Sequence, residues 1–189
     1  DEANLKVSNN PTNGYMLTAQ SGNTGGLTWV AAPSGGLSNS QQWRTSANQT
    51  GMSNNTVITN NWEEVDTNGY GRIGNAMTQS SGIFTFPATG YWLIDFRLLG
   101  LSSDVQDYLG AKMEITQNNS SYSQASEGYS NTDNNQWITV NLSFQLDVTN
   151  LSNQKVKFSI VAQNNGNVTA AGNTSYSFTS ATFTRLGDT

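Results

Sequence analysis

The sequence predicts an all-β protein, an antiparallel jelly-roll sandwich preceded by a small β-rich segment. From residue 57 onward, short apolar segments with a period of two residues recur along the chain. Gly, Asn, Ser and Pro, which favour turns, separate these segments. No window carries apolar residues at the roughly 3.6-residue spacing of an amphipathic helix. About eight to ten strands in roughly 130 residues are typical of a jelly roll.

Residues 1–34 are predicted to form a β-rich collar or shaft end. Three β-prone pieces, at 3–7, Tyr15–Ala19 and Leu27–Ala31, are separated by runs of Asn, Gly and Thr that favour turns. A meander this small cannot bury its own faces, so we expect it to pack against identical neighbours around an axis. Residues 35–56 are rich in Ser, Gly, Gln and Asn and are predicted to be a linker or extended arm.

The main domain, residues 57–189, contains its strongest predicted strand at 90–99. One face of this strand is apolar and carries Trp92, Ile94, Phe96 and Leu98. The other face mixes apolar and charged residues and carries Tyr91, Leu93, Asp95, Arg97 and Leu99. A strand that is apolar on both faces is normally buried on both, which predicts contact with a further surface such as a sister subunit. Asp95 and Arg97 could pair across that contact, or could meet solvent at the strand end.

Two later segments, at 138–148 and 156–162, also alternate apolar and polar residues with a period of two. A short turn containing Asn and Ser connects them, so they are expected to pair with each other as a hairpin. The last predicted strand, at 176–186, is expected to close the sheet.

The composition excludes several classes of function. A net charge of −5, with eight Lys and Arg residues, lacks the basic surface that nucleic acids and anionic membranes attract. The absence of Cys and His removes disulfides, thiol nucleophiles, the usual zinc ligands and the Ser triad. No apolar run approaches the roughly 18 residues of a membrane span. We therefore predict a protein that is not an enzyme, needs no cofactor, and binds neither nucleic acid nor membrane.

Two groups of carboxylates are the candidate catalytic or metal-binding residues. Glu63, Glu64 and Asp66 are close in sequence, but neighbours in a strand point to opposite faces and cannot flank one glycosidic bond together. Asp104 and Asp107, in a predicted loop, offer hard oxygen ligands of the kind that calcium prefers. They lack a Gly-bounded series of ligands, so we interpret both groups as solvated charges and predict no metal site.

Three predicted loops, at 102–108, 122–135 and 164–173, are the candidates for ligand contact. Their amides and exposed rings suit the hydroxyls and apolar faces of sugars. The candidate receptor-binding residues within them are Tyr108, Tyr122, Tyr129, Asn134 and Asn165. In the alternative interpretation, the Asn-rich loops only solubilise a chain in which 11% of residues are charged, and the Tyr rings pack internally.

The segment at 81–96 resembles a stretch of the globular head of complement component one q, and with it the wider tumour necrosis factor-like jelly roll. It reads SGIFTFPATGYWLIDF, which is similar to the pattern G-x-F-T-x-P-x-x-G-x-Y-x-F-x-x of that family. Segments at 60–71, 151–156 and 175–183 resemble further strands and a turn of the family in the same order. The resemblance implies a homotrimer, with the second face of the 90–99 strand as the trimer interface.

Residues 1–34 are similar to segments that precede the head in phage tail and fibre proteins. This resemblance implies a virion tail fibre or surface appendage, located outside the cell. We therefore expect the receptor-binding head of a trimeric phage tail fibre or similar appendage, which contacts neighbouring virion proteins and binds a host glycan or protein without catalysis. Two alternatives remain open: a structural trimerisation cap or capsid decoration protein, and a polysaccharide depolymerase.

Overall fold

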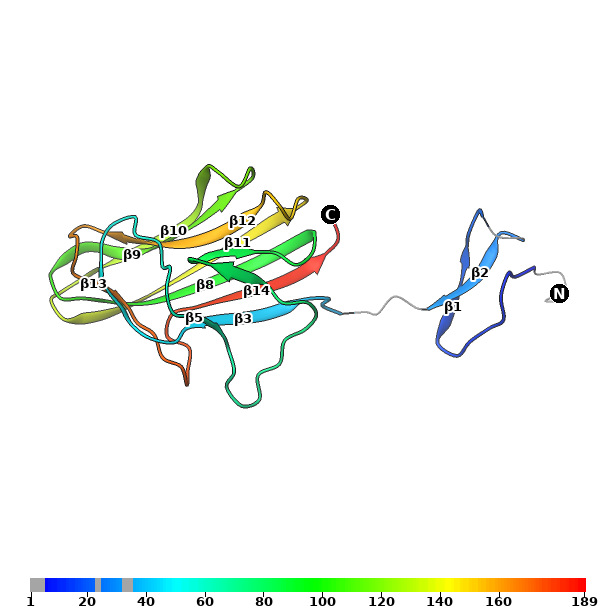
Figure 1. Ribbon diagram of the computed structural model, residues 1–189, viewed down its shortest axis with the longest axis horizontal. Coiled ribbons are helices and arrows are strands. Elements are labelled where there is room, and N and C mark those ends of the chain that lie inside the picture. The colour runs from blue at the N-terminus through cyan, green and yellow to red at the C-terminus, as the bar shows by residue number, and fades with distance from the viewer. Residues whose placement is uncertain (1–5, 23–24, 32–35) are drawn as a thin grey trace. The chain divides into compact units, whose positions relative to one another are not determined.

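The computed structural model describes residues 6–22, 25–31 and 36–189. The chain forms two compact units, and the boundary between them lies between Gly36 and Leu37 (Figure 1). The described residues form strands, turns and loops, and no helix among them is long and apolar enough to span a membrane. The prediction of an all-β protein is confirmed.

The N-terminal unit is a hairpin of two antiparallel strands, β1 (Tyr15–Ala19) and β2 (Leu27–Ala31). The predicted third piece, at 3–7, falls largely outside the described residues, but Val7 forms an isolated parallel bridge to the start of β2. Asn9 ties this approaching chain to the hairpin. Its Oδ1 accepts from the Trp29 amide at 2.7 Å, and its Nδ2 donates to the Trp29 carbonyl at 2.8 Å.

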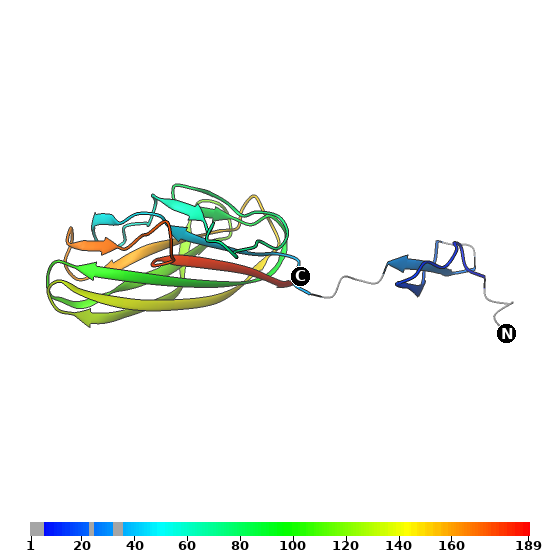
Figure 2. The same cartoon turned by 90° about the horizontal axis from the view of Figure 1, so that it is seen from below.

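The C-terminal unit is a sandwich of two antiparallel sheets (Figure 1, Figure 2). One sheet has five strands in the order β10-β9-β12-β7-β6. Their bounds are Thr78–Ser80 for β6, Ile83–Thr85 for β7, Gln106–Thr116 for β9, Tyr122–Thr132 for β10 and Lys155–Ala162 for β12. The other sheet has seven strands, in which β4-β13-β8-β14-β3-β5 follow one another and β11 pairs with β8. Their bounds are Ser40–Thr45 for β3, Gln49–Met52 for β4, Trp62–Glu64 for β5, Gly90–Ser102 for β8, Gln136–Val148 for β11, Val168–Ala170 for β13 and Ser180–Gly187 for β14.

The core lies between the two sheets and is rich in aromatic rings. Phe96 of β8 stacks on Phe158 of β12, with ring centroids 4.2 Å apart and planes at 9°. Phe84 of β7 meets Phe183 of β14 at a centroid distance of 5.0 Å. Such ring pairs add about 0.5–1.5 kcal/mol each beyond the burial of their area. Both pairs join strands of opposite sheets, so ring packing holds the two layers together.

The strongest predicted strand is present as β8, which continues to Ser102. Its apolar face is buried in the core as expected, with Trp92, Ile94, Phe96 and Leu98 at most 2% exposed. The last predicted strand is β14, which begins at Ser180 rather than at residue 176 and lies between β8 and β3. The ends of the C-terminal unit therefore meet, because β14 pairs directly with β3, the first strand of that unit.

The prediction of a linker at 35–56 is wrong for the part that forms β3 and β4. β3 pairs with β14 on one side and with β5 on the other. Its side chains are mostly polar, so no apolar alternation marks it, yet Arg44 and Thr45 are fully buried. Arg44 is neutralised there by Glu63 and Asp66. Backbone pairing and buried polar contacts, rather than apolar burial alone, stabilise this strand.

The predicted hairpin between 138–148 and 156–162 is also wrong. β11 pairs with β8 in the seven-stranded sheet, whereas β12 pairs with β9 and β7 in the five-stranded sheet. The connection between them crosses from one layer to the other and is braced by Gln154. The Gln154 side chain accepts from the Thr149 amide at 2.6 Å and donates to the Asp147 carbonyl at 2.8 Å. A period of two residues identifies strands but does not identify their partners.

The segment at 122–135, expected to be a loop, forms the edge strand β10 as far as Thr132. It pairs with β9 with register shifts between Gln124 and Ser126 and between Ser130 and Thr132. Its polar composition hides the alternation, because small residues such as Gly128 fill the face turned to the core. The other two predicted loops likewise contain the start of β9 and the short strand β13.

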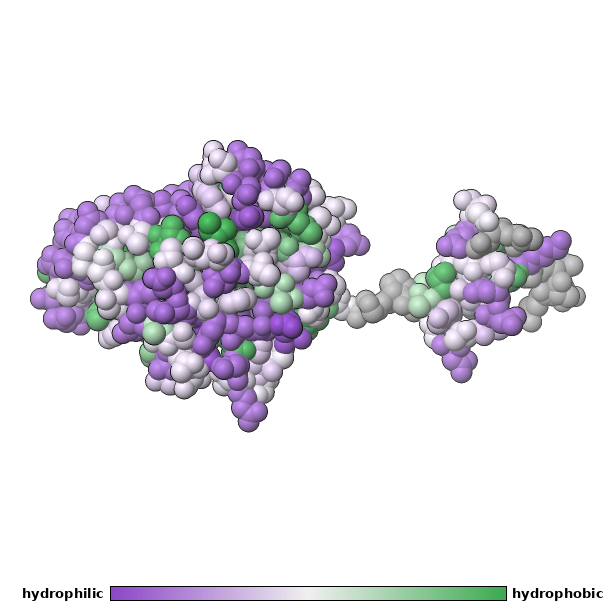
Figure 3. Space-filling view, viewed as in Figure 1, coloured by the Kyte–Doolittle hydropathy of each residue, from purple (hydrophilic) through white to green (hydrophobic). Residues whose placement is uncertain are grey.

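Hydrophilic and near-neutral residues cover most of the visible face of the C-terminal unit, with apolar residues in separate small patches (Figure 3). Since only 11% of the residues are charged, this surface owes its polarity mainly to amides and hydroxyls. Such a surface can offer many hydrogen bonds without a strong electrostatic field.

Candidate functional site

The candidate site lies on the solvent face of the five-stranded sheet, where β9 is paired with β10 on one side and β12 on the other. Alternation along β9 turns Leu109, Ala111 and Met113 into the core and Tyr108, Gly110 and Lys112 away from it. In the paired register, Gly110 lies between Tyr129 of β10 and Val161 of β12. Gly110 is itself buried, and a Cβ there would lie 2.0 Å from the Gly128 carbonyl oxygen, so β10 lies close against β9 at this point. A hollow in the surface is lined by the neighbouring Tyr129 and Val161.

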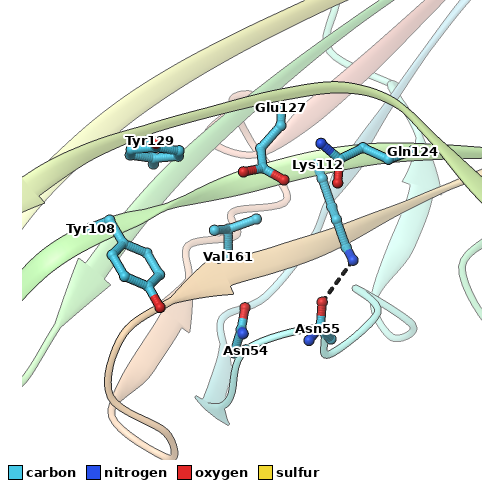
Figure 4. A pocket seen from close by; sticks show the side chains of 8 residues that line it. All are labelled: Asn54, Asn55, Tyr108, Lys112, Gln124, Glu127, Tyr129 and Val161. Atoms are coloured by element: carbon cyan, nitrogen blue, oxygen red, sulfur yellow. Dashed lines mark hydrogen bonds between the residues drawn. The ribbon is translucent and has the colours of Figure 1, made fainter.

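This hollow has a volume of about 320 Å³ and is open to solvent (Figure 4). Its size is at the lower end of the roughly 300–1,000 Å³ of small-molecule sites. The lining comes from β9, β10, β12 and the turn after β4, and consists of Asn54, Asn55, Tyr108, Lys112, Gln124, Glu127, Tyr129 and Val161. Tyr108 and Tyr129 are both predicted receptor-binding residues, and the structure brings them together here.

The two Tyr rings form one wall of the hollow. Their centroids are 5.8 Å apart and their planes are tilted by 59°. The Tyr129 side chain is 61% exposed, although aromatic rings of this size normally gain stability by packing. The tilted rings therefore present an apolar corner beside polar side chains, which suits a small molecule with one apolar face and a polar edge.

The turn after β4 holds Asn54 and Asn55 at the rim. The Asn54 amide donates to Asn165 Oδ1 at 2.9 Å, and its own Oδ1 accepts from the Ala162 amide at 3.2 Å. Asn55 adopts the left-handed conformation, with φ at 63°, and its Oδ1 accepts from Lys112 Nζ at 2.7 Å (Figure 4). Since both side-chain oxygens are engaged, each amide keeps its NH2 group as a donor for a ligand.

Glu127 differs from Lys112, the other charged residue of the lining, because its carboxylate has no hydrogen-bond or ion-pair partner among the described residues. Lys112 lies opposite Glu127 in the strand pair, but its ammonium donates to Asn55 Oδ1 in the turn after β4. Lys112 Nζ also lies 3.7 Å from Glu114 Oε1. Glu114, in contrast, also accepts from the Ser159 hydroxyl. In Figure 4 the Glu127 carboxylate points into the hollow, where it is available to accept hydrogen bonds.

The other predicted receptor-binding residues do not line the hollow. Tyr122 lies on β10, where Lys157 Nζ covers its ring at 4.2 Å from the centroid. Burial raises the pKa of the Tyr122 hydroxyl, and the nearby charge of Glu114 raises it further. Asn134 belongs to the turn between β10 and β11. Asn165 does not line the hollow itself, but its Oδ1 accepts from the Asn54 amide and so holds the Asn54 backbone at the rim.

The predicted trimer-interface residues lie on the face of β8 that is turned away from the core. Tyr91, Asp95 and Arg97 are exposed in the single chain, whereas Leu93 and Leu99 are half-buried. Neither charge of this group forms an ion pair with a described residue. Asp95 is opposite Ser143, and Arg97 is opposite Asn141, on the paired strand β11. Both charges therefore remain available to a further surface.

The weak metal candidates, Asp104 and Asp107, accept from amides in the structure. Gln163 Nε2 donates to Asp107 Oδ2 at 2.8 Å, and Asn164 Nδ2 donates to Asp104 Oδ2 at 3.4 Å. Within the described ranges, no group of three or more Asp, Glu, His or Cys side chains is arranged to hold a metal ion.

The carboxylates Glu63, Glu64 and Asp66 are engaged by guanidinium groups. Arg44 Nε lies 2.8 Å from Glu63 Oε1, and Arg44 also pairs with Asp66. Arg72 Nη1 lies 2.6 Å from Glu64 Oε2. These ion pairs explain the acidic cluster as part of the fold around β3 and β5.

The candidate residues named from the sequence do not include six residues of the lining, namely Asn54, Asn55, Lys112, Gln124, Glu127 and Val161. Of these, Gln124 and Glu127 lie within the predicted contact segment at 122–135. A usable signal was present on β9, where the core positions Leu109, Ala111 and Met113 alternate with the outward positions. That alternation identifies Lys112 as a neighbour of Tyr108 on the same face. The residues contributed by β10 required its pairing register, which its polar composition conceals.

No family model matches the chain, and no curated protein matches its sequence. Solved structures do match. Murine APRIL at pH 5.0 shares 13% identity at a TM-score of 0.56, over 78% of this chain and 98% of APRIL. The Eiger TNF of S. frugiperda shares 11% identity at a TM-score of 0.60, over 79% of this chain and 93% of Eiger. The vertex protein P5 of PRD1 shares 14% identity over 81% of this chain and all of P5, but a TM-score of 0.47 supports no argument. At these identities the likeness shows the fold alone, and it confirms a tumour necrosis factor-like jelly roll.

Proposed function

We propose that this chain is the receptor-binding head of a trimeric phage tail fibre or similar virion appendage, which binds a host surface glycan or protein without catalysis. The observation that carries the proposal is the hollow between β9, β10 and β12, where the exposed ring of Tyr129 and the half-buried ring of Tyr108 meet unpaired polar groups. An exposed ring corner with free donors and an unpaired acceptor is typical of a binding surface. The N-terminal unit, residues 1–36, is then the collar that joins the head to the rest of the fibre.

The trimer is part of the same proposal. The solvent face of β8 and β11 carries Tyr91, which is 39% exposed, and Trp137, which is 52% exposed. Large apolar side chains of this kind gain stability when a second subunit covers them. The hollow lies in the other layer of the sandwich, so trimer contacts on the seven-stranded sheet would leave it open. Three linked copies of one weak site strengthen attachment to a surface by orders of magnitude.

The lining of the hollow favours binding over hydrolysis. Glycoside hydrolysis generally needs two carboxyl groups about 5–9.5 Å apart. Glu127 supplies one carboxyl group, and the remaining lining residues are amides, rings, a Lys and a Val. This composition argues against the depolymerase alternative.

Attachment can be tested with the fluorescently labelled full chain on a panel of bacterial isolates. We expect at least one isolate to be stained, and we expect Tyr129→Ala to abolish the staining. Tyr122→Ala is the matched control, because Tyr122 is a Tyr of the same strand outside the hollow. The rival role of a trimerisation cap or decoration protein predicts a folded trimer that stains no isolate. Equal staining by wild type and Tyr129→Ala would also contradict the proposed site.

A further inference from the structure

We infer that the hollow binds one sugar residue of a neutral saccharide and discriminates against acidic sugars. This inference rests on the proposed function and specifies the ligand class for the same site. It follows from three properties of the lining. These are the apolar corner formed by the rings of Tyr108 and Tyr129 (the ring corner), the balance of hydrogen-bond donors and acceptors, and the unpaired Glu127 carboxylate.

The ring corner requires a ligand with an apolar face. Tyr129 offers an open ring face at 61% exposure, and Tyr108 closes one side at a centroid distance of 5.8 Å. Sugar rings carry a patch of C–H groups on one face and hydroxyls around the edge. Such a ring can lie against Tyr129 and keep its hydroxyls directed towards the opposite, polar side of the hollow.

The polar side requires a ligand that both donates and accepts hydrogen bonds. The Nδ2 groups of Asn54 and Asn55 can only donate, and the Glu127 carboxylate can only accept. Gln124, also without a partner among the described residues, can do either. Neighbouring hydroxyls of one sugar meet both requirements, because each hydroxyl donates one hydrogen and accepts through its lone pairs. A bidentate contact of two hydroxyls with Glu127 would be charge-assisted and therefore strong.

The charges of the lining select for a neutral ligand. Glu127 and Lys112 are its charged residues and are opposite in sign. The Lys112 ammonium is already bound by Asn55 and has Glu114 at 3.7 Å, so it offers little to an anion. The free Glu127 carboxylate would repel the carboxylate of a uronic or sialic acid. A cationic group could be accepted by Glu127 but would leave the two NH2 donors without an acceptor, so the lining suits a neutral ligand that both donates and accepts.

Saturation-transfer NMR on the full chain tests this inference. The probes are the methyl glycosides of glucose, galactose, mannose, fucose and rhamnose, with glucuronic acid and N-acetylneuraminic acid as acidic counterparts and glucosamine as a cationic one. We expect signals from at least one neutral glycoside and none from the acids. Tyr129→Ala should abolish the signal, whereas Tyr122→Ala should keep it.

The variant Glu127→Gln isolates the role of the charge. It preserves the shape of the side chain and replaces one acceptor oxygen by a donor. We expect about a tenfold weaker Kd for the neutral glycoside, which corresponds to about 1.4 kcal/mol, and a gain of measurable binding to glucuronic acid. Unchanged preference between neutral and acidic sugars in Glu127→Gln would overturn the role of this carboxylate.

The outcomes separate this inference from the proposed function. If labelled protein stains an isolate but no neutral glycoside gives a signal or competes for staining, the saccharide class is wrong and attachment stands, with a protein receptor as its target. If glucuronic acid or glucosamine binds as well as the neutral sugars, the charge argument is wrong. If the chain stains no isolate and binds no sugar, both the function and its ligand class fail.

Discussion

Replacement of Arg44 by Met tests whether the polar strand β3 is an integral part of the sandwich. The Arg44 side chain is fully buried and donates to Glu63 Oε1 at 2.8 Å and to Thr67 Oγ1 at 2.6 Å. It also donates to Asp66 and to the Thr174 carbonyl. One guanidinium therefore joins β3, the segment after β5 and the loop before β14.

The expected loss of stability follows from what the substitution leaves behind. Removal of one partner from a buried ion pair costs about 3–5 kcal/mol, because the remaining charge stays without compensation. Here the Asp66 side chain is 77% exposed and Glu63 is 29% exposed, so water can recover part of their solvation. We therefore expect about 3 kcal/mol, at the lower end of that range. For a unit of this size, such a loss lowers the melting temperature by roughly 6–12 °C.

Thermal unfolding followed by circular dichroism, with urea unfolding as a second measurement, checks this value. Arg72→Met is the matched control, because the Arg72–Glu64 pair is 37% and 30% exposed and should contribute at most about 1 kcal/mol. Arg44→Lys keeps the charge but loses the planar fork of donors, so an intermediate loss is expected. If Arg44→Met melts within about 3 °C of wild type, or no lower than Arg72→Met, the assignment of Arg44 as a buried clamp is refuted.

Three further perturbations address the hollow, the alkaline range and the trimer. Gly110→Val should cost about 1–3 kcal/mol, because a Cβ at this position would lie 2.0 Å from the Gly128 carbonyl oxygen and 2.8 Å from Tyr129 Cβ. β10 must shift to relieve this contact, which moves Tyr129 and should weaken sugar binding; normal stability and binding would contradict that geometry. Burial raises the pKa of Tyr122 above its ordinary value of 10.0, so the unfolded state loses this proton first and the unfolding free energy falls as the pH rises above about 10. Tyr122→Phe should therefore show a shallower fall in urea stability between about pH 9 and 11, and an identical slope would argue against the raised pKa. Light scattering of the purified chain should give the mass of a trimer. If Asp95 and Arg97 pair between subunits, Arg97→Ala should weaken the trimer. An unchanged mass of the Arg97→Ala variant in native mass spectrometry at low protein concentration would exclude that pairing.

Side-chain periodicity predicts the parts of this fold that are stabilised by large apolar residues. β8 is identified because Trp92, Ile94, Phe96 and Leu98 alternate without interruption. β3 carries no such pattern, because Arg44 and Thr45 are buried through polar contacts that arise only when distant segments meet. The pairing of β11 and β12 depends on a crossing between layers, and a pattern along one strand contains no information about the layer of its partner.

The candidate site was likewise only partly predictable from the sequence. Tyr108 and Tyr129 stand out in the sequence as aromatic residues in polar surroundings. Their contact depends on the register of β9 and β10, which places Tyr129 opposite Gly110. Nothing in the sequence distinguishes Glu127 from other surface carboxylates. Its carboxylate is free because Lys112, its cross-strand neighbour, donates to Asn55 instead.

The edge strand β10 has a consequence for how the protein behaves when many copies are crowded together. An edge strand exposes backbone donors and acceptors that can pair with a strand of another molecule and start a fibril. With 11% charged residues, electrostatic repulsion between molecules is weak and cannot be the main protection. The register shifts at Gln124/Ser126 and Ser130/Thr132 break the regular spacing of these groups along β10, and Glu127 adds a charge between them. The irregularity of this edge thus disfavours its pairing with a strand of another molecule while its outward side chains remain free to bind.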